Sequence, residues 1–206
     1  MNEKNIVRLA TAPAFALWLA AIVGATIWIT IYSDTPGREG NVPRNWPEQS
    51  RIALAGGCPT LLVFAHPKCP CTKASIGELD RLMARLQGRI AAHVLFLKPA
   101  TVAEGWAETD LWREASAIPG VAVQLDAGGE EARRFNCLTS GDTLLYNANG
   151  RLLFHGGITL SRGHSGDNPG RSAILALLEE GTAKGTRTPV FGCPLFDAEC
   201  TTKKPL

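Results

Sequence analysis

Apolar residues along the chain fall into short runs and one-sided stripes that predict alternating strands and helices. Residues 60–65 form a short, continuously apolar run, which is typical of a strand buried on both faces. Residues 72–87 carry apolar side chains at helical spacing, with Glu78 among the charged residues of the opposite face. Strands that alternate with helices predict an α/β fold, and a late hairpin adds antiparallel strands to its sheet. The same patterns predict further strands at 94–97, 121–125, 144–146 and 152–154, and further helices at 110–117, 130–135 and 172–180.

A long apolar segment precedes these elements. Residues 13–32 contain no charged side chain, and about 20 apolar residues are enough for a helix to span a bilayer. Trp18 and Trp28 lie near the two ends of this segment, where indole rings favour the membrane interface. A cleavable secretory signal has a shorter apolar core, of about 7 to 15 residues, that ends at small side chains. We therefore expect an uncleaved transmembrane anchor, with the lipid bilayer as its partner.

The anchor divides the chain into parts with different expected roles. Basic residues are almost equally frequent on its two sides, so they do not decide its orientation. Paired cysteines persist in oxidising compartments, and the chain has six cysteines. We therefore expect a bacterial inner-membrane protein whose domain faces the periplasm. The expected parts are a cytoplasmic tail at 1–12, the anchor at 13–32, a Pro- and Gly-rich linker at 33–51, the folded domain at 52–181 and a C-terminal tail at 182–206.

Composition and charge exclude several classes of protein. A formal net charge of +2 and the lack of a Lys/Arg run argue against a nucleic-acid partner. A hydrophobic fraction of 45% excludes a disordered polyelectrolyte. The glycine-rich segment 155–170 matches neither the P-loop nor the dinucleotide-binding pattern, so we expect no nucleotide cofactor.

Three stretches of the sequence carry a resemblance to known proteins. They are FAHPKCPCTKASIGEL at 64–79, GRLLFHGGITLSRGHSGDN at 150–168 and VFGCPL at 190–195. Together with the buried strand and the closing hairpin and helix, they resemble the thioredoxin-like superfamily and, within it, the membrane-anchored RedB group. The resemblance mainly covers residues 58–181 and implies a three-layer sandwich with a mixed sheet. It implies fold and topology more than chemistry, so the hypothesis of a thiol–disulfide oxidoreductase acting on an unidentified protein partner depends on the cysteines themselves.

The Cys-Pro-Cys motif departs from the thioredoxin pattern. The resemblance puts Cys69 at the nucleophile position, and Thr72 stands where the second cysteine would be. Cys71 is displaced one residue earlier. Asp142 stands where the resembled proteins carry a cis-proline. Ordinary thioredoxin activity is therefore not expected.

The position of the two cysteines predicts a reactive thiolate. Cys69 and Cys71 precede or begin a helix, whose free N–H groups and dipole stabilise a negative charge. Lys68 and Lys73 act in the same direction, and such settings lower a cysteine pKa. We expect water to reach Cys69 and the first helical turn to shield Cys71. A disulfide between them closes a small, strained ring, which favours an oxidant or isomerase.

The leading hypothesis assigns catalytic roles to three residues. Cys69 attacks or is attacked, and Cys71 resolves the mixed disulfide. Asp142 is expected to raise the pKa of the thiols by repulsion. Two other roles for Asp142 stay open: a proton acceptor for the thiol, and a cap for the turn before the hairpin.

Two other functions are compatible with the same residues. The first is a Cu(I)-binding assembly factor, because thiolates and imidazoles suit that ion. Its ligands would be His66, Cys69, Cys71 and His155. The second is a non-catalytic interaction domain with Trp106 and Trp112 on its contact surface.

The remaining cysteines leave several pairings open. Cys193 and Cys200 lie seven residues apart, and a disulfide between them would close a small loop in the tail. Cys58 and Cys137 can be free thiols, a second disulfide or resolving partners for the motif. Six cysteines allow 15 complete pairings, so the sequence does not select one.

Overall fold

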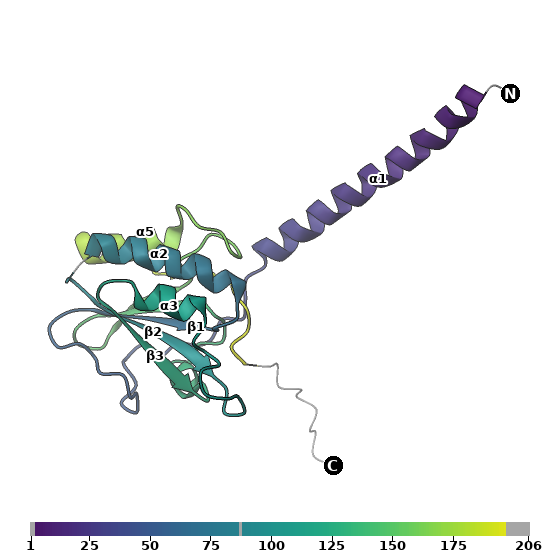
Figure 1. The fold of residues 1–206 in the computed structure, drawn as a ribbon. Helices are drawn as coiled ribbons and strands as arrows, with labels where there is room; N and C mark the ends of the chain where they lie inside the picture. The colour runs from purple at the N-terminus through teal and green to yellow at the C-terminus, as the bar shows by residue number, and fades with distance from the viewer. Residues whose placement is uncertain (1–2, 87, 197–206) are drawn as a thin grey trace, which may run out of the picture. The chain divides into compact units, whose positions relative to one another are not determined.

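The structure is a computed structural model that describes residues 3–86 and 88–196 (Figure 1). The chain divides into two compact units, one ending at Thr35 and the other beginning at Pro36. The first unit contains a single helix, and the second contains the sheet with all other helices.

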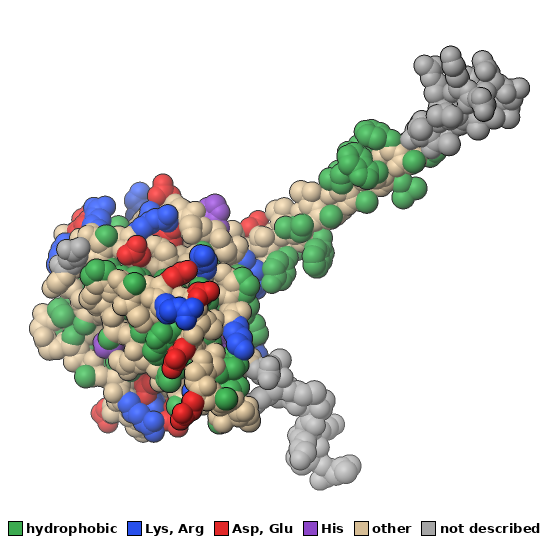
Figure 2. Space-filling model, viewed as in Figure 1, with side chains coloured by type: hydrophobic (Ala, Val, Ile, Leu, Met, Phe, Trp, Pro, Cys, Tyr) green, Lys and Arg blue, Asp and Glu red, His purple; other side chains and the backbone are tan. Residues whose placement is uncertain are grey.

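The first unit is the helix α1, Glu3–Asp34. Its portion Pro13–Asp34 has a mean hydropathy of 2.1 and is long and apolar enough to cross a membrane. Polar residues inside it are satisfied locally, since the hydroxyls of Thr26 and Thr30 each donate 2.9 Å hydrogen bonds to carbonyls one turn earlier. Hydrophobic side chains follow α1 in Figure 2, whereas charges of both signs are interspersed on the visible face of the second unit. The predicted apolar segment is therefore helical throughout.

The second unit is built on a mixed six-stranded sheet. Its strand order is β3-β2-β1-β4-β5-β6. The first three strands are parallel, β4 runs antiparallel to β1, β5 antiparallel to β4, and β6 parallel to β5. Every residue of the central strand β1 is buried, as its continuous apolar run predicts. The strands are β1 Thr60–Ala65, β2 Ala91–Lys98, β3 Val121–Ala127, β4 Asp142–Tyr146, β5 Leu152–Gly156 and β6 Arg187–Thr188.

Helices cover the two faces of this sheet unequally. One hydrophobic cluster joins the sheet to α2, Pro70–Leu86, to α3, Asp110–Ser116, and to α5, Pro169–Glu179, which lie on one side of it in Figure 1. The cluster on the other face joins the short helix α4, Glu130–Arg134, to irregular chain at 42–54. The predicted α/β class with a mixed sheet is confirmed. The second outer layer is mostly irregular chain rather than helix.

The segment expected to be a linker packs on the domain. Trp46 lies against Phe135 and Tyr146, with ring centroids 5.1 Å and 5.2 Å apart. Its neighbour Val42 is buried in the same cluster. The apolar residues of this segment are widely spaced and follow no period, so pattern analysis treats it as a linker.

The segment expected to be a C-terminal tail also packs on the domain. After α5, β6 extends the sheet, and Val190 and Leu195 are buried on either side of Cys193. Backbone hydrogen bonds connect this segment to residues 138–140. Cys200 lies outside the described residues.

A buried carboxylate joins α2 to the glycine-rich loop that follows β5. Glu78 has no exposed surface, although the helical pattern puts it on the polar face. Its oxygens accept hydrogen bonds from the Gly166 N–H at 2.8 Å and the Asn168 amide at 3.3 Å, and they pair with Arg81 and Arg171. Four donors compensate the burial of this charge. Glu78 thereby fixes a loop that carries a residue of the candidate site.

Candidate active site

Cys69 lies where the buried strand β1 gives way to the helix α2. A turn closed by a 3.1 Å hydrogen bond from the Cys69 N–H to the His66 carbonyl leads the chain out of the strand. Pro70 is the first helical residue, a position that suits its fixed φ and missing N–H. Cys69 therefore occupies the N-cap position, where a side chain can accept hydrogen bonds from the first turn. Cys71 lies in that first turn, so the two cysteines of the motif are close together.

A third cysteine joins them from the C-terminal segment. The segment runs antiparallel to residues 138–140, with a bridge between Thr139 and Pro194. The Ser140 N–H donates to the Cys193 carbonyl at 2.8 Å, and the Leu195 N–H donates to the Leu138 carbonyl at 2.9 Å. This pairing brings the Cys193 thiol into hydrogen-bond contact with Cys69.

Cys69 is the thiol whose ionisation the surroundings favour. Burial acts to raise its pKa, but hydrogen bonds from Cys193 and Thr72 outweigh this effect and hold the pKa below its ordinary value. Each of these residues contributes both its side chain and its backbone N–H. The N-terminal end of the α2 dipole acts in the same direction. Cys69 is thus the first of the three thiols to become a thiolate.

Cys71 and Cys193 are held in the protonated state beside it. Burial raises the pKa of Cys71, and the negative charge of Cys69 and a hydrogen bond to it raise that pKa further. Burial and the same two effects raise the pKa of Cys193 to about 12. The Arg162 guanidinium opposes both shifts, and it also donates to the Gly192 carbonyl at 2.5 Å. The site therefore pairs one thiolate with two thiol donors and a cation.

Burial of the two motif cysteines differs from the sequence-based expectation. Cys69 is 1% exposed and Cys71 is 9% exposed, so the expected nucleophile is the better covered of the two. A residue just ahead of a helix is expected to face water. Cys193 and its neighbours lie there instead, and no local pattern in the tail indicates that docking.

The lysines expected to lower the Cys69 pKa make other contacts. The Lys68 ammonium lies 4.6 Å from the centroid of the Trp106 ring, and Lys73 pairs with Glu114 at 3.7 Å. The cation that lowers the pKa of Cys71 and Cys193 is instead Arg162, from the glycine-rich loop. The tryptophans considered for a contact surface pack against the hydrophobic core, with Trp112 5.4 Å from Phe96 between ring centroids.

The four residues considered for Cu(I) are not gathered into one site. His66 Nδ1 accepts a 3.2 Å hydrogen bond from the Lys68 N–H, and its ring packs edge-on against Trp106. Burial and the charge of Lys68 lower the pKa of His66, which favours the neutral imidazole. His155 Nε2 instead lies 3.0 Å from a carboxylate oxygen of Asp142. Within the described part of the chain, no group of three or more His, Cys, Asp or Glu side chains is arranged to hold a metal ion.

Asp142 belongs to a buried polar cluster with Cys137 and His155. Burial raises the pKa of the Cys137 thiol well above its ordinary value, and the negative charge of Asp142 acts in the same direction. All three side chains are buried. The contacts that shift the Cys69 pKa come from Cys193 and Thr72. The repulsion expected from Asp142 thus acts directly on Cys137.

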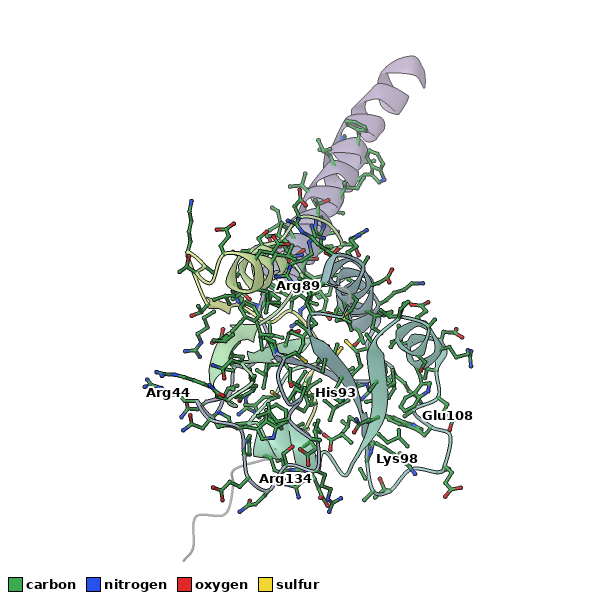
Figure 3. All side chains as sticks on the ribbon, turned by 90° about the vertical axis from the view of Figure 1, so that its left-hand side faces the viewer. Arg44, Arg89, His93, Lys98, Glu108 and Arg134 are labelled. Atoms are coloured by element: carbon green, nitrogen blue, oxygen red, sulfur yellow. The ribbon has the colours of Figure 1, made fainter. Side chains whose placement is uncertain are left out.

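Two other candidates near β1 lie away from the end of the strand that leads to Cys69. Cys58 is half-buried just before β1, whereas Cys69 follows the strand. His93 is paired in register with Leu62, and its ring lies 3.1 Å from the Gln124 amide. Figure 3 labels His93 and Lys98, which stand near the start and at the end of β2. Cys58 therefore provides a control thiol remote from the site.

Four residues of the site were not assigned this role from sequence: Thr72, Ser140, Arg162 and Cys193. Ser140 Oγ accepts a 2.8 Å hydrogen bond from the His66 N–H and lies 2.8 Å from the Thr72 hydroxyl. It thereby joins the turn before β4 to the turn that carries Cys69. The available signal was the VFGCPL stretch, whose Cys-Pro step keeps Cys193 extended.

Comparison with known proteins identifies the fold. No protein-family model matches the chain, and no curated protein matches it. The strand order and the position of Cys69 after the central strand decide the fold class. The fold is thioredoxin-like.

Solved structures share this fold at low sequence identity. An uncharacterized conserved protein from Geobacillus kaustophilus is 17% identical, with a TM-score of 0.57 over 79% of this chain and 92% of that chain. A hypothetical protein from Sinorhizobium meliloti 1021 is 20% identical, with a TM-score of 0.55 over 78% and 93%. A secreted Mycobacterium tuberculosis disulfide oxidoreductase is similar over a smaller part, 47% of this chain and 67% of that chain, at 21% identity and a TM-score of 0.39, which does not show a shared fold.

Proposed function

We propose that this chain is a membrane-tethered thiol–disulfide oxidoreductase in which Cys69 is the nucleophile. The observation that carries the proposal is the position of Cys69 at the N-terminus of α2 in contact with Thr72 and Cys193, which lower its pKa although its side chain is only 1% exposed. Burial alone raises a thiol pKa, so the donors from Thr72 and Cys193 must outweigh it. Thiolates, not thiols, attack disulfides, and buried structural cysteines lack such donors.

The reaction begins at Cys69. Its thiolate attacks one sulfur of a disulfide in a protein partner, a bond forms between the two sulfurs, and the partner's second sulfur leaves as a thiolate that takes up a proton. The thiolate of Cys71 then attacks Cys69 Sγ. A disulfide closes between Cys69 and Cys71, and the partner leaves with both of its cysteines reduced. The two electrons that reduce the partner come from the two cysteines, and the reverse sequence oxidises a partner dithiol.

The electrostatics of the site make the second step follow the first. Before the reaction, the charge on Cys69 raises the pKa of Cys71. In the mixed disulfide Cys69 carries no charge, so this contribution disappears. The Arg162 guanidinium, which lowers the Cys71 pKa, then acts without that opposition. Cys71 becomes a better nucleophile at the moment when it is needed.

Trapping of mixed disulfides tests the proposal. Both Cys71 and Cys193 contact Cys69, so both must be replaced to leave Cys69 without a resolving thiol. We expect the Cys71→Ser, Cys193→Ser double variant to accumulate disulfide-linked complexes with partner proteins. These complexes should separate on reduction in a diagonal gel, and peptide mapping should locate the bond at Cys69.

Two matched variants control this experiment. Replacing Cys69 by serine in the same double variant should remove the complexes, because the nucleophile is gone. A Cys58→Ser change in that background should leave their yield unaltered, since Cys58 lies at the other end of β1. Complexes that persist without Cys69 would contradict the proposed nucleophile.

The membrane anchor and the RedB assignment belong to the same proposal. Support for the anchor comes from the length and hydropathy of Pro13–Asp34. An oxidising compartment outside the cytoplasm suits a protein that carries reactive cysteines, and we assign the domain to the periplasm of a bacterium. The three stretches that resemble the RedB group support membership of that group.

Fractionation tests the anchor. We expect the full-length chain to sediment with membranes and to stay there in alkaline carbonate, because a spanning helix is held by hydrophobic burial rather than by charge. The N-terminal sequence of the mature protein should still begin ahead of Pro13. A mature chain that starts after α1 would identify a cleaved signal instead. Protease added to spheroplasts should digest the domain, and its protection would reverse the orientation.

A further inference from the structure

A cysteine from the C-terminal segment faces the proposed nucleophile in a way that resembles a bound substrate. The segment pairs along residues 138–140 through two backbone hydrogen bonds, and an added strand of this kind is a common mode of peptide binding. Cys193 lies at one end of the pairing, next to the bridge between Thr139 and Pro194, and contacts Cys69. Buried Val190 and Leu195 hold the segment on both sides.

The backbone of this segment leaves little freedom to the thiol. Pro194 restricts Cys193 to extended conformations. A methyl group on Gly192 would lie 1.8 Å from the Ser140 carbonyl oxygen, so only glycine permits the close approach of the two chains. The Arg162 guanidinium also holds the Gly192 carbonyl. Pro194, Gly192 and Arg162 therefore restrict the backbone that positions the Cys193 thiol beside Cys69.

We infer that Cys193 is a third redox-active cysteine, which takes over the disulfide from Cys71 so that the oxidised protein rests with Cys69 linked to Cys193. The inference rests on the proposed function. The step is an internal exchange: the Cys193 thiolate attacks Cys69 Sγ, the Cys69–Cys193 bond forms, the Cys69–Cys71 bond breaks, and Cys71 leaves as a thiolate that takes up the proton lost by Cys193. No net oxidation occurs.

The strain of a small disulfide ring favours exchange from the Cys69–Cys71 bond to the Cys69–Cys193 bond. A disulfide between Cys69 and Cys71 spans one intervening residue and closes a small ring, and a strained disulfide is easily broken. Cys193 approaches from another part of the chain, so the bond to Cys69 requires no such ring. The docked segment also presents Cys193 to Cys69 at a high effective concentration. A partner thiolate that attacks Cys69 in the resting form expels Cys193 in place of Cys71.

Disulfide mapping tests the inference on the full-length chain in detergent micelles. The protein is equilibrated with glutathione redox buffers, quenched with acid, alkylated and digested, and its linked peptides are identified by mass. We expect the Cys69–Cys193 peptide to dominate. A Cys193–Cys200 bond, or a Cys69–Cys71 bond with Cys193 alkylated, would overturn the inference. In the Cys193→Ser variant the bond should move to Cys71, with an equilibrium constant against glutathione at least tenfold lower.

A glycine variant tests docking without removing a thiol. Gly192→Ala should reduce the equilibrium constant for the Cys69–Cys193 disulfide at least tenfold, because the methyl group pushes the segment away from Ser140. Gly185→Ala is the matched control in the same tail, since nothing lies within 4 Å of the added methyl group. Equal constants in the two variants would overturn the inference. If Gly192→Ala does not fold, the Cys193→Ser comparison still decides it.

A separate measurement distinguishes failure of the proposed function from failure of this inference. Cys69 should form a glutathione adduct with glutathione disulfide in the Cys71→Ser, Cys193→Ser variant. No adduct there would remove Cys69 as the nucleophile, and the inference with it. An adduct at Cys69 together with an unlinked Cys193 in the unaltered chain would overturn the inference alone.

Discussion

Replacing Glu78 by alanine should lower the free energy of unfolding of the domain by about 3 kcal/mol. Removing one partner of a buried ion pair costs roughly 3 to 5 kcal/mol, and the lower figure applies because Arg81 and Arg171 keep some contact with water. The Gly166 N–H also loses its acceptor. For a domain of this size, Tm should fall by roughly 6 to 12 °C in a thermal unfolding experiment.

An exposed ion pair provides the matched control. Glu179 accepts two 2.8 Å hydrogen bonds from Arg85, but both side chains are partly in water, so Glu179→Ala should cost only about 0.5 kcal/mol. Equal destabilisation by the two variants would show that Glu78 does not fasten the glycine-rich loop. The Glu78 variant should in addition weaken the influence of Arg162 on the thiols, because Arg162 lies on that loop.

The elements of this fold were predictable because each one carries a periodic pattern. β1 is apolar throughout since it is buried on both faces, and α2 shows a stripe because one side of it covers the sheet. The Asn-Ala-Asn-Gly turn between β4 and β5 predicts a hairpin, because Asn and Gly are common in tight turns. When buried positions repeat with a regular period, the sequence of that segment alone is enough to predict the element.

The contacts that complete the site were not predictable in this way. Cys193 reaches Cys69 through an irregular segment whose few apolar residues follow no period, and Arg162 does so through a glycine-rich loop. The helical pattern puts Glu78 on the polar face of α2, where a residue is usually solvated. Hydrogen-bond donors about ninety positions later in the chain permit its burial. Each case depends on long-range docking of irregular chain, which leaves no local pattern. The approach of Cys69 and Cys71, by contrast, follows from their separation by one residue.

Replacing Thr72 by valine should raise the pKa of Cys69 by about one unit and reduce its reaction with iodoacetamide at pH 6 by about tenfold. Valine keeps the shape of the buried side chain but removes the hydroxyl that lowers the Cys69 pKa. The lowered pKa supplies thiolate at pH values where an ordinary thiol is protonated, so losing the donor moves the whole rate profile to higher pH. Near pH 10 the rates of the two proteins should converge.

Thr72→Ser distinguishes this electrostatic effect from a packing change. Serine restores the hydroxyl and should restore the pH profile, although it removes the methyl group. The same donor stabilises the reduced protein, so its loss should shift the reduction potential by up to about 30 mV to more negative values for one pKa unit. A weakened contact with Ser140 alone would lower stability without moving either quantity. If Thr72→Val leaves the alkylation profile in place, the low pKa of Cys69 rests on Cys193 and the helix dipole, and a Cys193→Ala variant, which removes the donor, should then raise that pKa.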